Sequence, residues 1–166
     1  TGTLSMKEIE ELESFLKRNK AIYSILHCIT EYPADKKNCN LKLIPLLKRK
    51  FNCPIGYSDH TSDNIASLSA VSLGANIIEK HFKLNKRDKT LDSKFSIPPD
   101  EMEELIKKSK ETWITLGTEK KFIEKKSYLD LRRSIYVTET INAGQKISKK
   151  NIKVIRPGLG LEPKYY

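Results

Sequence analysis

The feature that most constrains this sequence is a repeated alternation of short apolar segments with segments of helical periodicity. The apolar segments span 21–28, 53–57 and 75–81, and each is nearly continuous and of strand length. Continuous apolar runs of this length are typical of strands that are buried on both faces of a sheet. Because helical segments precede, separate and follow them, the pattern predicts an α/β protein with a parallel sheet or barrel.

The first two helical segments differ in how well their residues suit a helix. Ser5 and Glu8 have the spacing of a capping box, which predicts a helix over 6–18. The segment that follows Asn40, the expected cap, places its apolar residues on one face. Pro45 falls just past the first turn of that helix, where it is expected to remove one hydrogen bond and cause a kink.

Two further helices are predicted before residue 118. Asp63 is a candidate cap for the first of them, which is expected to end at Gly74. Its expected buried stripe consists of Ile65, Leu68, Val71 and Leu73. The second begins at Pro98-Pro99-Asp100 and ends at Gly117.

The pattern changes after residue 117. Residues 118–131 are rich in charge and are interpreted as a linker. Short strand-like pieces follow at 134–137, 144–147 and 152–155. Roughly 35 residues of β character are too few for an independent core, so the sequence predicts the beginning of a second, small β domain.

Polar side chains gather where the predicted strands end. They are Thr30, Tyr32, Ser58, Asp59, His60, Glu79 and His81. The loops at the carboxyl ends of parallel strands converge, so functional groups of α/β proteins lie there. Adjacent strands lie about 4.8 Å apart. His60 and His81 are therefore candidates to share one divalent cation, provided that both rings turn inward.

A structural interpretation of these histidines competes with the functional one. A lone histidine near a strand end is more often a satisfied structural residue than a ligand. Two histidines at equivalent positions in consecutive units favour the metal-ligand interpretation more than a single one does, so both interpretations stay open. The spacing of His60 and His81 matches neither HExxH nor a zinc finger. His27 is interpreted as structural. Asp92, in the polar loop after the last of these strands, is by default a solvated charge.

The net charge of +10 raises nucleic acid as a possible partner. However, only six of the 31 basic residues are arginines, and the lysines are spread along the chain among glutamates. Nucleic-acid-binding proteins more often cluster arginine and interleave exposed aromatic residues. We therefore expect no nucleic-acid partner, whereas an anionic small substrate suits this charge.

Cysteine usage and hydropathy bear on location. Cys28, Cys39 and Cys53 form no CxxC motif and cannot all pair, which indicates reduced thiols in a cytosolic protein. The sequence has no apolar run of about 18 residues. Its first residues have neither the basic nor the apolar region of a signal peptide. We expect a cytoplasmic protein without a membrane span.

Several segments together resemble the sialic acid synthases, a family that includes N-acetylneuraminate, legionaminate and pseudaminate synthases. The segments that carry the resemblance are HCITEYP (27–33), NLKLI (40–44), PIGYSDHT (54–61), GANIIEKHF (74–82) and SIPPDE (96–101). RRSI (132–135) and NIKVIRPGLG (151–160) resemble the antifreeze-like (SAF) domain that follows the barrel in the same family. Order and spacing hold over nearly the whole chain.

The resemblance implies a (β/α)8 TIM barrel, with 1–117 as its C-terminal half, 118–131 as a linker and 132–166 as a partial SAF domain. The family condenses phosphoenolpyruvate with an N-acylated aminosugar, typically N-acetylmannosamine, to give a sialic-acid-type sugar and phosphate. The full-length enzyme is expected to be a domain-swapped homodimer. The first half of the barrel is absent from the sequence. The chain is therefore expected to be a fragment, a truncated product, or a piece completed by a separate N-terminal half.

The same matching implies a metal site. His60 and His81 match histidines that hold Mn²⁺ or Mg²⁺, which polarises the aldehyde oxygen as a Lewis acid. Ser58 is expected to help hold the phosphate of phosphoenolpyruvate. Glu79 matches an acidic residue beside the metal ligand, to which only a supporting role is assigned.

Further positions match residues that bind the sugar. Tyr32 and Asp92 match sugar contacts, and Thr30 occupies a position that is asparagine in some members. Arg156 matches an arginine that reaches from the antifreeze-like domain into the partner subunit's site, where it binds the sugar's acyl end. The loop over 89–94 reads KTLDSK where the family usually has Gly-Pro-Asp-His before the lysine, but the spacing to Asp92 is kept.

Other classes of function stay open at this point. One is a non-catalytic remnant or assembly fragment that binds metal or a partner chain without turnover. Another is nucleic-acid binding, which a salt-sensitive shift with generic duplex would support. The sequence alone does not select among the possible aminosugars, and we expect no synthase activity from the chain alone.

Overall fold

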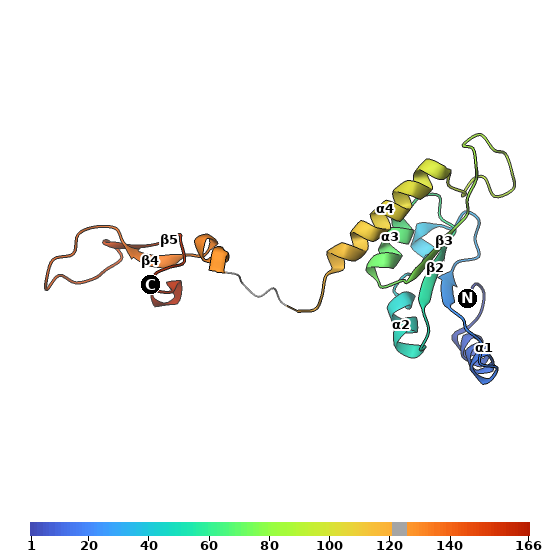
Figure 1. Ribbon diagram of the computed structural model, residues 1–166, viewed down its shortest axis with the longest axis horizontal. Helices are drawn as coiled ribbons and strands as arrows, with labels where there is room; N and C mark the ends of the chain where they lie inside the picture. The colour runs from blue at the N-terminus through green and yellow to red at the C-terminus, as the bar shows by residue number, and fades with distance from the viewer. Residues whose placement is uncertain (121–125) are drawn as a thin grey trace. The chain divides into compact units, whose positions relative to one another are not determined.

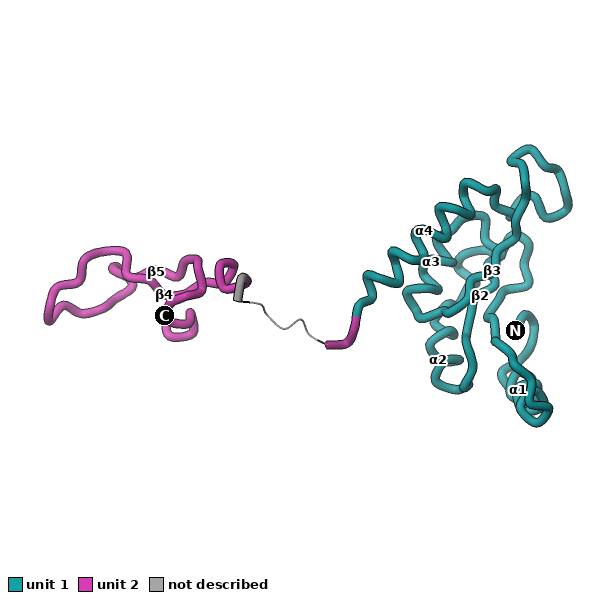
Figure 2. Tube along the Cα trace, viewed as in Figure 1, with its two compact units in different colours: residues 1–117 teal, residues 118–166 magenta. Residues whose placement is uncertain are grey.

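The structure is a computed structural model that describes residues 1–120 and 126–166 (Figure 1). It divides into two compact units, 1–117 and 118–166, each of which is described by itself (Figure 2). The predicted linker over 118–131 lies in part outside the described residues. Its last part, Lys126–Leu131, forms the 3-10 helix η2.

A parallel sheet forms the centre of the first unit. Among the described residues it has three strands, β1 (Ile25–Cys28), β2 (Ile55–Asp59) and β3 (Ile77–Lys80), in the order β1-β2-β3. Both neighbouring pairs are parallel, with Cys28 beside Ser58 and Ser58 beside Glu79. The predicted α/β class and the parallel pairing are confirmed.

The outer strands are shorter than the apolar segments that predicted them. The amide of Ile25 donates to the carbonyl of Pro54 at 3.0 Å, where pairing with β2 begins, and residues 21–24 precede this bond. Ile22 is consequently fully exposed. Every residue of β2 is buried, whereas β3 alternates exposed and half-buried residues. The predicted burial on both faces therefore holds for β2, the central strand, which pairs with β1 and β3 at its two edges and is packed against α2 and α3.

Helices cover the sheet and lead into its strands. α1 (Met6–Arg18) begins at Ser5 with the predicted capping box. η1 (Lys36–Asn38) precedes α2 (Leu43–Lys50), and both α2 and α3 (Ile65–Ser72) pack on β2. α4 (Pro99–Leu116) lies beside α3 and ends at Gly117, whose φ of 58° suits glycine (Figure 1). The core beneath includes Ile9, Ile44, Leu47, Phe51, Ile55, Tyr57, Ala66 and Ala70.

The kink predicted at Pro45 is wrong. α2 begins at Leu43 and not directly after Asn40, whose φ is +45°. Pro45 therefore lies in the first turn, where backbone N–H groups have no partner within the helix. Its missing N–H removes no helical hydrogen bond.

The third helix is also placed differently from its prediction. The N-cap position is Asn64, although Oδ1 of Asp63 still accepts a hydrogen bond from the amide of Ile65 at 3.0 Å. Ile65 is exposed, contrary to the predicted stripe. The buried face is made of Ala66, Ser67, Ala70 and Val71. These mostly small side chains allow α3 to approach both β2 and α4 closely.

The second unit contains an antiparallel pair in its described part, β4 (Ser134–Val137) with β5 (Ile152–Ile155), followed by the 3-10 helix η3 (Pro163–Tyr165). The strand predicted over 144–147 is wrong. Gly144 has a φ of 83°, and the amide of Gln145 donates to the carbonyl of Asn142 at 3.0 Å, so this segment turns. Within 1–120 and 126–166, none of the helices has the length and apolar character needed to span a lipid bilayer.

Candidate active site

Ser58 and Glu79 face each other at the carboxyl end of the sheet. They are partners in the register of β2 and β3, so their side chains lie on the same face. The Ser58 hydroxyl donates to Oε1 of Glu79 at 2.7 Å. Side chains alternate along a strand, so this face differs from the one that carries Tyr57 and Asp59 toward the buried interior.

His60 follows β2 and turns onto the same face as Ser58. Its Nδ1 lies 2.7 Å from the carbonyl oxygen of Ile29, so this nitrogen is the one that carries a hydrogen. Its Nε2 lies 3.2 Å from Oγ of Ser58. The single hydroxyl hydrogen of Ser58 is directed to Glu79, so Nε2 faces an oxygen lone pair.

His81 follows β3 and is held less tightly. Its Nδ1 lies 3.6 Å from Oδ2 of Asp92, and the two side chains are 33% and 58% exposed. The main chain of Asp92 is fixed by a turn, because its carbonyl accepts the amide and the hydroxyl of Ser96 at 3.0 and 2.6 Å. The predicted partner Asp92 therefore lies beside His81.

The two histidine rings form one cluster with the rings of Tyr32 and Phe95. The centroids of His60 and His81 are 5.3 Å apart. Tyr32 stacks on His60 at 4.3 Å between centroids, and Phe95 meets His81 edge to face at 4.7 Å. Phe95 was not a predicted site residue, and the signal in the sequence that could have drawn attention to it is an aromatic residue in an otherwise charged loop.

The two remaining predicted residues have different surroundings. Thr30 is exposed and directly follows Ile29, the residue whose carbonyl holds His60. Arg156 belongs to the second unit, where its Nε donates to the carbonyl of Leu131 at 2.8 Å. The structure thus brings Tyr32, Ser58, His60, Glu79, His81 and Asp92 together on the first unit.

The donor atoms of this site suit a partly hydrated divalent ion. Among the described residues no group of three or more His, Cys, Asp or Glu side chains could enclose a metal. The two histidines nevertheless present a pair of nitrogens, and Nδ1 of His60 is fixed by a carbonyl, as is usual for ligating histidines. An ion held by these two nitrogens would need further oxygen ligands, such as water, which Mn²⁺ and Mg²⁺ accept.

A parallel sheet with paired histidines at its carboxyl end defines an α/β protein, a class in which ligands commonly bind at the strand-end loops. The model of the NeuB family matches residues 1–121, and the chain belongs to this family.

Relatives of known activity are similar over the entire chain. It is 36% identical to a pseudaminic acid synthase of Campylobacter jejuni over 169 residues, which cover 100% of this chain and 49% of that protein. It is 37% identical to an N,N'-diacetyllegionaminic acid synthase of the same species, over 100% of this chain and 52% of that protein. The chain therefore spans about half the length of the curated relatives it matches.

A solved structure supports the same fold. The N-acetylneuraminic acid synthetase of Leptospira borgpetersenii, crystallised with citrate, superposes with a TM-score of 0.71 and 36% identity, over 76% of this chain and 44% of that chain. Synthases of pseudaminic, legionaminic and sialic acid, which are nonulosonic acids, are thus among the proteins to which this chain is similar.

Proposed function

We propose that this chain carries the C-terminal half of the active site of a nonulosonic acid synthase. The reaction joins the methylene carbon of phosphoenolpyruvate to the aldehyde carbon of an N-acylated aminosugar, such as N-acetylmannosamine. Water adds to the neighbouring carbon and phosphate leaves by C–O cleavage. The observation that carries the proposal is the pairing of His60 with His81, 5.3 Å apart between ring centroids, beside the Ser58–Glu79 hydrogen bond.

The histidines are proposed to hold Mn²⁺ or Mg²⁺, which when bound polarises the aldehyde oxygen. The Ser58 hydroxyl is proposed to help hold the phosphate of phosphoenolpyruvate, for which its hydrogen turns from Glu79 to a phosphate oxygen. Tyr32, half-exposed and stacked on His60, presents an aromatic wall suited to a sugar ring.

Two residues in the loops that follow the strands, Thr30 and Asp92, complete the proposed sugar subsite. Thr30 is exposed beside Ile29, and Asp92 lies beside His81, so each offers oxygen atoms for hydrogen bonds to sugar hydroxyl or amide groups. The basic residues Lys83, Lys86, Arg87, Lys89 and Lys94 occur in the loop after β3. They favour the approach of an anionic substrate.

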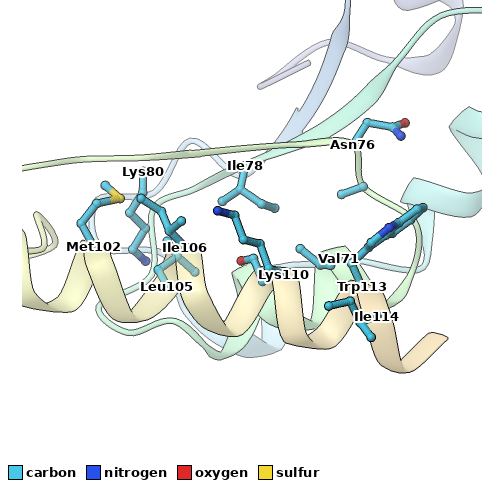
Figure 3. A pocket seen from close by; sticks show the side chains of 12 residues that line it. Val71, Asn76, Ile78, Lys80, Met102, Leu105, Ile106, Lys110, Trp113 and Ile114 are labelled. Carbon is cyan, nitrogen blue, oxygen red and sulfur yellow. The ribbon is translucent and has the colours of Figure 1, made fainter. Parts of the chain in front are cut away.

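The partner proposed for the first unit is the other half of a (β/α)8 barrel. Supporting this, a groove of about 680 Å³ lies between β3 and the helices α3 and α4 (Figure 3). Its exposed apolar side chains include Ile106, Trp113 and Ile114 on α4. Such surface is typical of an interface that another element covers.

The second unit is proposed to begin an antifreeze-like domain over 132–166. In a domain-swapped homodimer, Arg156 of this domain would bind the acyl end of the sugar in the partner subunit's site. Gly158, two residues after Arg156, lets the chain pass close to Arg132. A Cβ at position 158 would lie 2.5 Å from the Cβ of Arg132, so only glycine fits there.

A metal- or partner-binding fragment without turnover is the second candidate. The observation that favours it is the groove along α4, whose exposed apolar side chains Ile106, Trp113 and Ile114 offer a surface to a partner chain. Metal binding is shared by both candidates, whereas condensation of the two substrates belongs to the first.

Titration with MnCl₂ by calorimetry tests the site that carries the proposal. We expect micromolar binding by the purified chain, which His60→Ala and His81→Ala each abolish. His27→Gln is the matched control, because His27 is a buried histidine outside the ring cluster. Binding that survives both alanine substitutions would contradict the proposed metal site.

A further inference from the structure

A buried ion pair immediately precedes the two histidines in the sequence. Asp59 comes before His60, Lys80 comes before His81, and the two are partners in the register of β2 and β3. Nζ of Lys80 lies 3.0 Å from Oδ2 of Asp59, and the side chains are 1% and 0% exposed. The pair therefore lies at the same level of the sheet as the site, on its opposite face.

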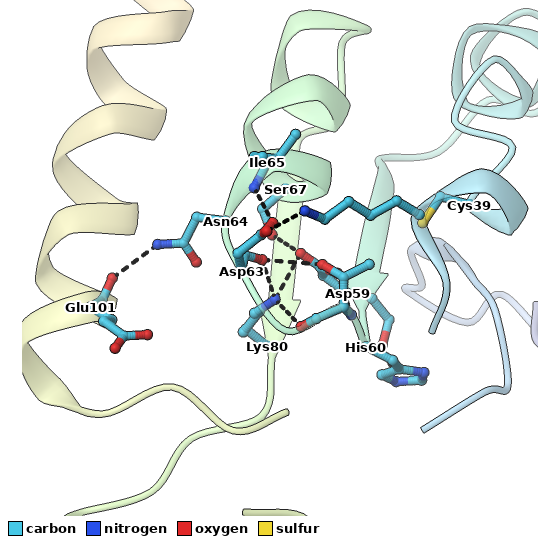
Figure 4. A network of polar contacts seen from close by, with 12 residues as sticks. Cys39, Asp59, His60, Asp63, Asn64, Ile65, Ser67, Lys80 and Glu101 are labelled. Carbon is cyan, nitrogen blue, oxygen red and sulfur yellow. Dashed lines mark hydrogen bonds and ion pairs between the residues drawn. The ribbon is translucent and has the colours of Figure 1, made fainter. Parts of the chain in front are cut away.

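The ammonium group of Lys80 has a complete set of partners. Besides Asp59, it donates to the carbonyls of Thr61 and Asp63, each at 2.7 Å (Figure 4). An ammonium group has three hydrogens, and all of them are used here. Two of the three acceptors are main-chain atoms of the loop that begins with His60.

Asp59 holds the same loop from the other side of the ion pair. Its Oδ1 accepts the amide of Thr61 at 2.8 Å, and its Oδ2 accepts the hydroxyl of Ser67 at 2.5 Å. Asp59 thus binds the loop to the end of β2, and its carboxylate also joins β2 to helix α3. The His60 side chain points away from the ion pair, so any effect on its ring passes through the backbone (Figure 4).

Stability alone accounts poorly for such a pair. Removing two charges from water is costly, and well-packed apolar residues of similar volume are often as stabilising as a buried ion pair. Apolar residues at positions 59 and 80 would not specify the register between β2 and β3. A shift of β3 by one residue would turn its side chains to the opposite face, separating Lys80 from Asp59 and His81 from His60.

We propose that Asp59 and Lys80 are positioning residues for the two-histidine site. Their ion pair forms only in the register that brings His60 and His81 to the same height, and the bonds to Thr61 and Asp63 fix the backbone that carries His60. This inference rests on the function proposed for the two histidines.

The test compares the parent chain with Asp59→Asn/Lys80→Met, in which both charges are removed together. Circular dichroism and thermal melting report folding, calorimetry reports Mn²⁺ affinity, and NMR reports the ring hydrogens of His60, which are shifted by the stacked ring of Tyr32. We expect a folded chain with about 10- to 100-fold weaker Mn²⁺ binding and an altered His60 ring shift.

Ser67→Ala is the matched control. It removes one hydrogen bond to the same carboxylate but leaves the ion pair and the loop carbonyls in place. We expect a lower melting temperature with Mn²⁺ affinity within about twofold of the parent, since this bond does not set the register. Equal losses of affinity in Ser67→Ala and in the double variant would overturn the positioning role.

A folded double variant with parental affinity and an unchanged His60 ring shift would also overturn it. If the double variant does not fold, Lys80→Arg replaces it, because a planar guanidinium keeps the charge but cannot occupy the same three-acceptor site as an ammonium. The Mn²⁺ affinity and the His60 ring shift of Lys80→Arg are then compared with those of the parent chain. Absence of Mn²⁺ binding by the parent would contradict the proposed metal site, and the ring shift alone would then test positioning.

Discussion

The hydroxyl of Ser58 donates to Oε1 of Glu79 at 2.7 Å, across the register pair that joins β2 to β3. The same oxygen lies 3.2 Å from Nε2 of His60. Since a hydroxyl has only one hydrogen, Glu79 turns an oxygen lone pair of Ser58 toward the histidine. The carboxylate thereby controls which atom the Nε2 nitrogen of His60 faces.

Substituting Glu79→Gln tests this relationship. The amide retains the size of the side chain but removes its charge and can donate to Ser58, which frees the hydroxyl hydrogen for His60. We expect Mn²⁺ affinity to fall about tenfold, as is usual when a partner of metal ligands is changed. Calorimetry measures the effect, with Glu103→Gln on the exposed face of α4 as the control. Equal affinities of the two variants would contradict the role of Glu79.

Tyr32 is expected to stabilise the ring cluster through its face and not through its hydroxyl. Tyr32→Phe should change the free energy of unfolding by less than about 0.5 kcal/mol. Tyr32→Ala should lower it by about 1 kcal/mol or more, because the stack on His60 and the contact with Phe95 are lost. Urea unfolding measures both. A Tyr32→Phe variant as unstable as Tyr32→Ala would instead assign the stabilisation to the hydroxyl.

Local signals predicted much of the fold. The capping box of Ser5 and Glu8 and the stop at Gly117 depend on neighbouring residues, and both occur as expected. Pro45 was misjudged because a shift of the helix start by two residues moves it into the first turn. Boundaries of this kind depend on packing, which periodicity does not record.

Alternation along single strands predicted which candidate residues would lie on one face of the sheet. Ser58 and Glu79 lie near the ends of their strands, and His60 and His81 follow two residues later, a spacing that places them on the same face. Phe95 was missed because its place depends on a long-range contact, the parallel bridge between Phe82 and Ile97 that returns the loop to the sheet. The spacing of His81 and Asp92 in sequence likewise contains no information on the turn that brings them together.

His27 should make stability depend on pH. Burial lowers the pKa of His27 below its ordinary value of 6.5, although the bond of its Nε2 to the carbonyl of Cys39 acts in the opposite sense. The unfolded chain therefore binds more protons, so this contribution is complete above about pH 6.5 and is lost as the pH falls.

Urea unfolding between pH 5 and 8 measures this dependence on His27. The slope attributable to one proton is at most about 1.4 kcal/mol per pH unit, and His27→Gln should remove it. Since the other histidines remain in that variant, the difference between the two profiles isolates His27. Parallel profiles would show that the pKa of His27 is unchanged by folding.

Gly56 should resist even the smallest substitution. A Cβ at this position would lie 2.6 Å from the carbonyl oxygen of Ile77 and 2.9 Å from its Cβ. Gly56→Ala must therefore separate β2 from β3, at a cost of about 1–3 kcal/mol in the free energy of unfolding. It should also lengthen the Ser58–Glu79 contact and weaken Mn²⁺ binding. Parental stability and affinity together would contradict this close approach of the strands.

The purified chain of residues 1–166 is expected to release no phosphate from phosphoenolpyruvate with any sugar tested. It spans about half the length of the synthases it resembles, and the apolar groove along α4 marks where a further half-barrel is proposed to pack. The assay is phosphate release with N-acetylmannosamine and with deoxygenated diacylamino sugars. Release that requires both substrates would contradict the prediction.

Fusion to the first half of the Campylobacter pseudaminic acid synthase should restore release with at least one sugar. His81→Ala should abolish the restored activity, because the pair with His60 is then broken. A fusion that turns over equally well with this substitution would remove His81 from the site.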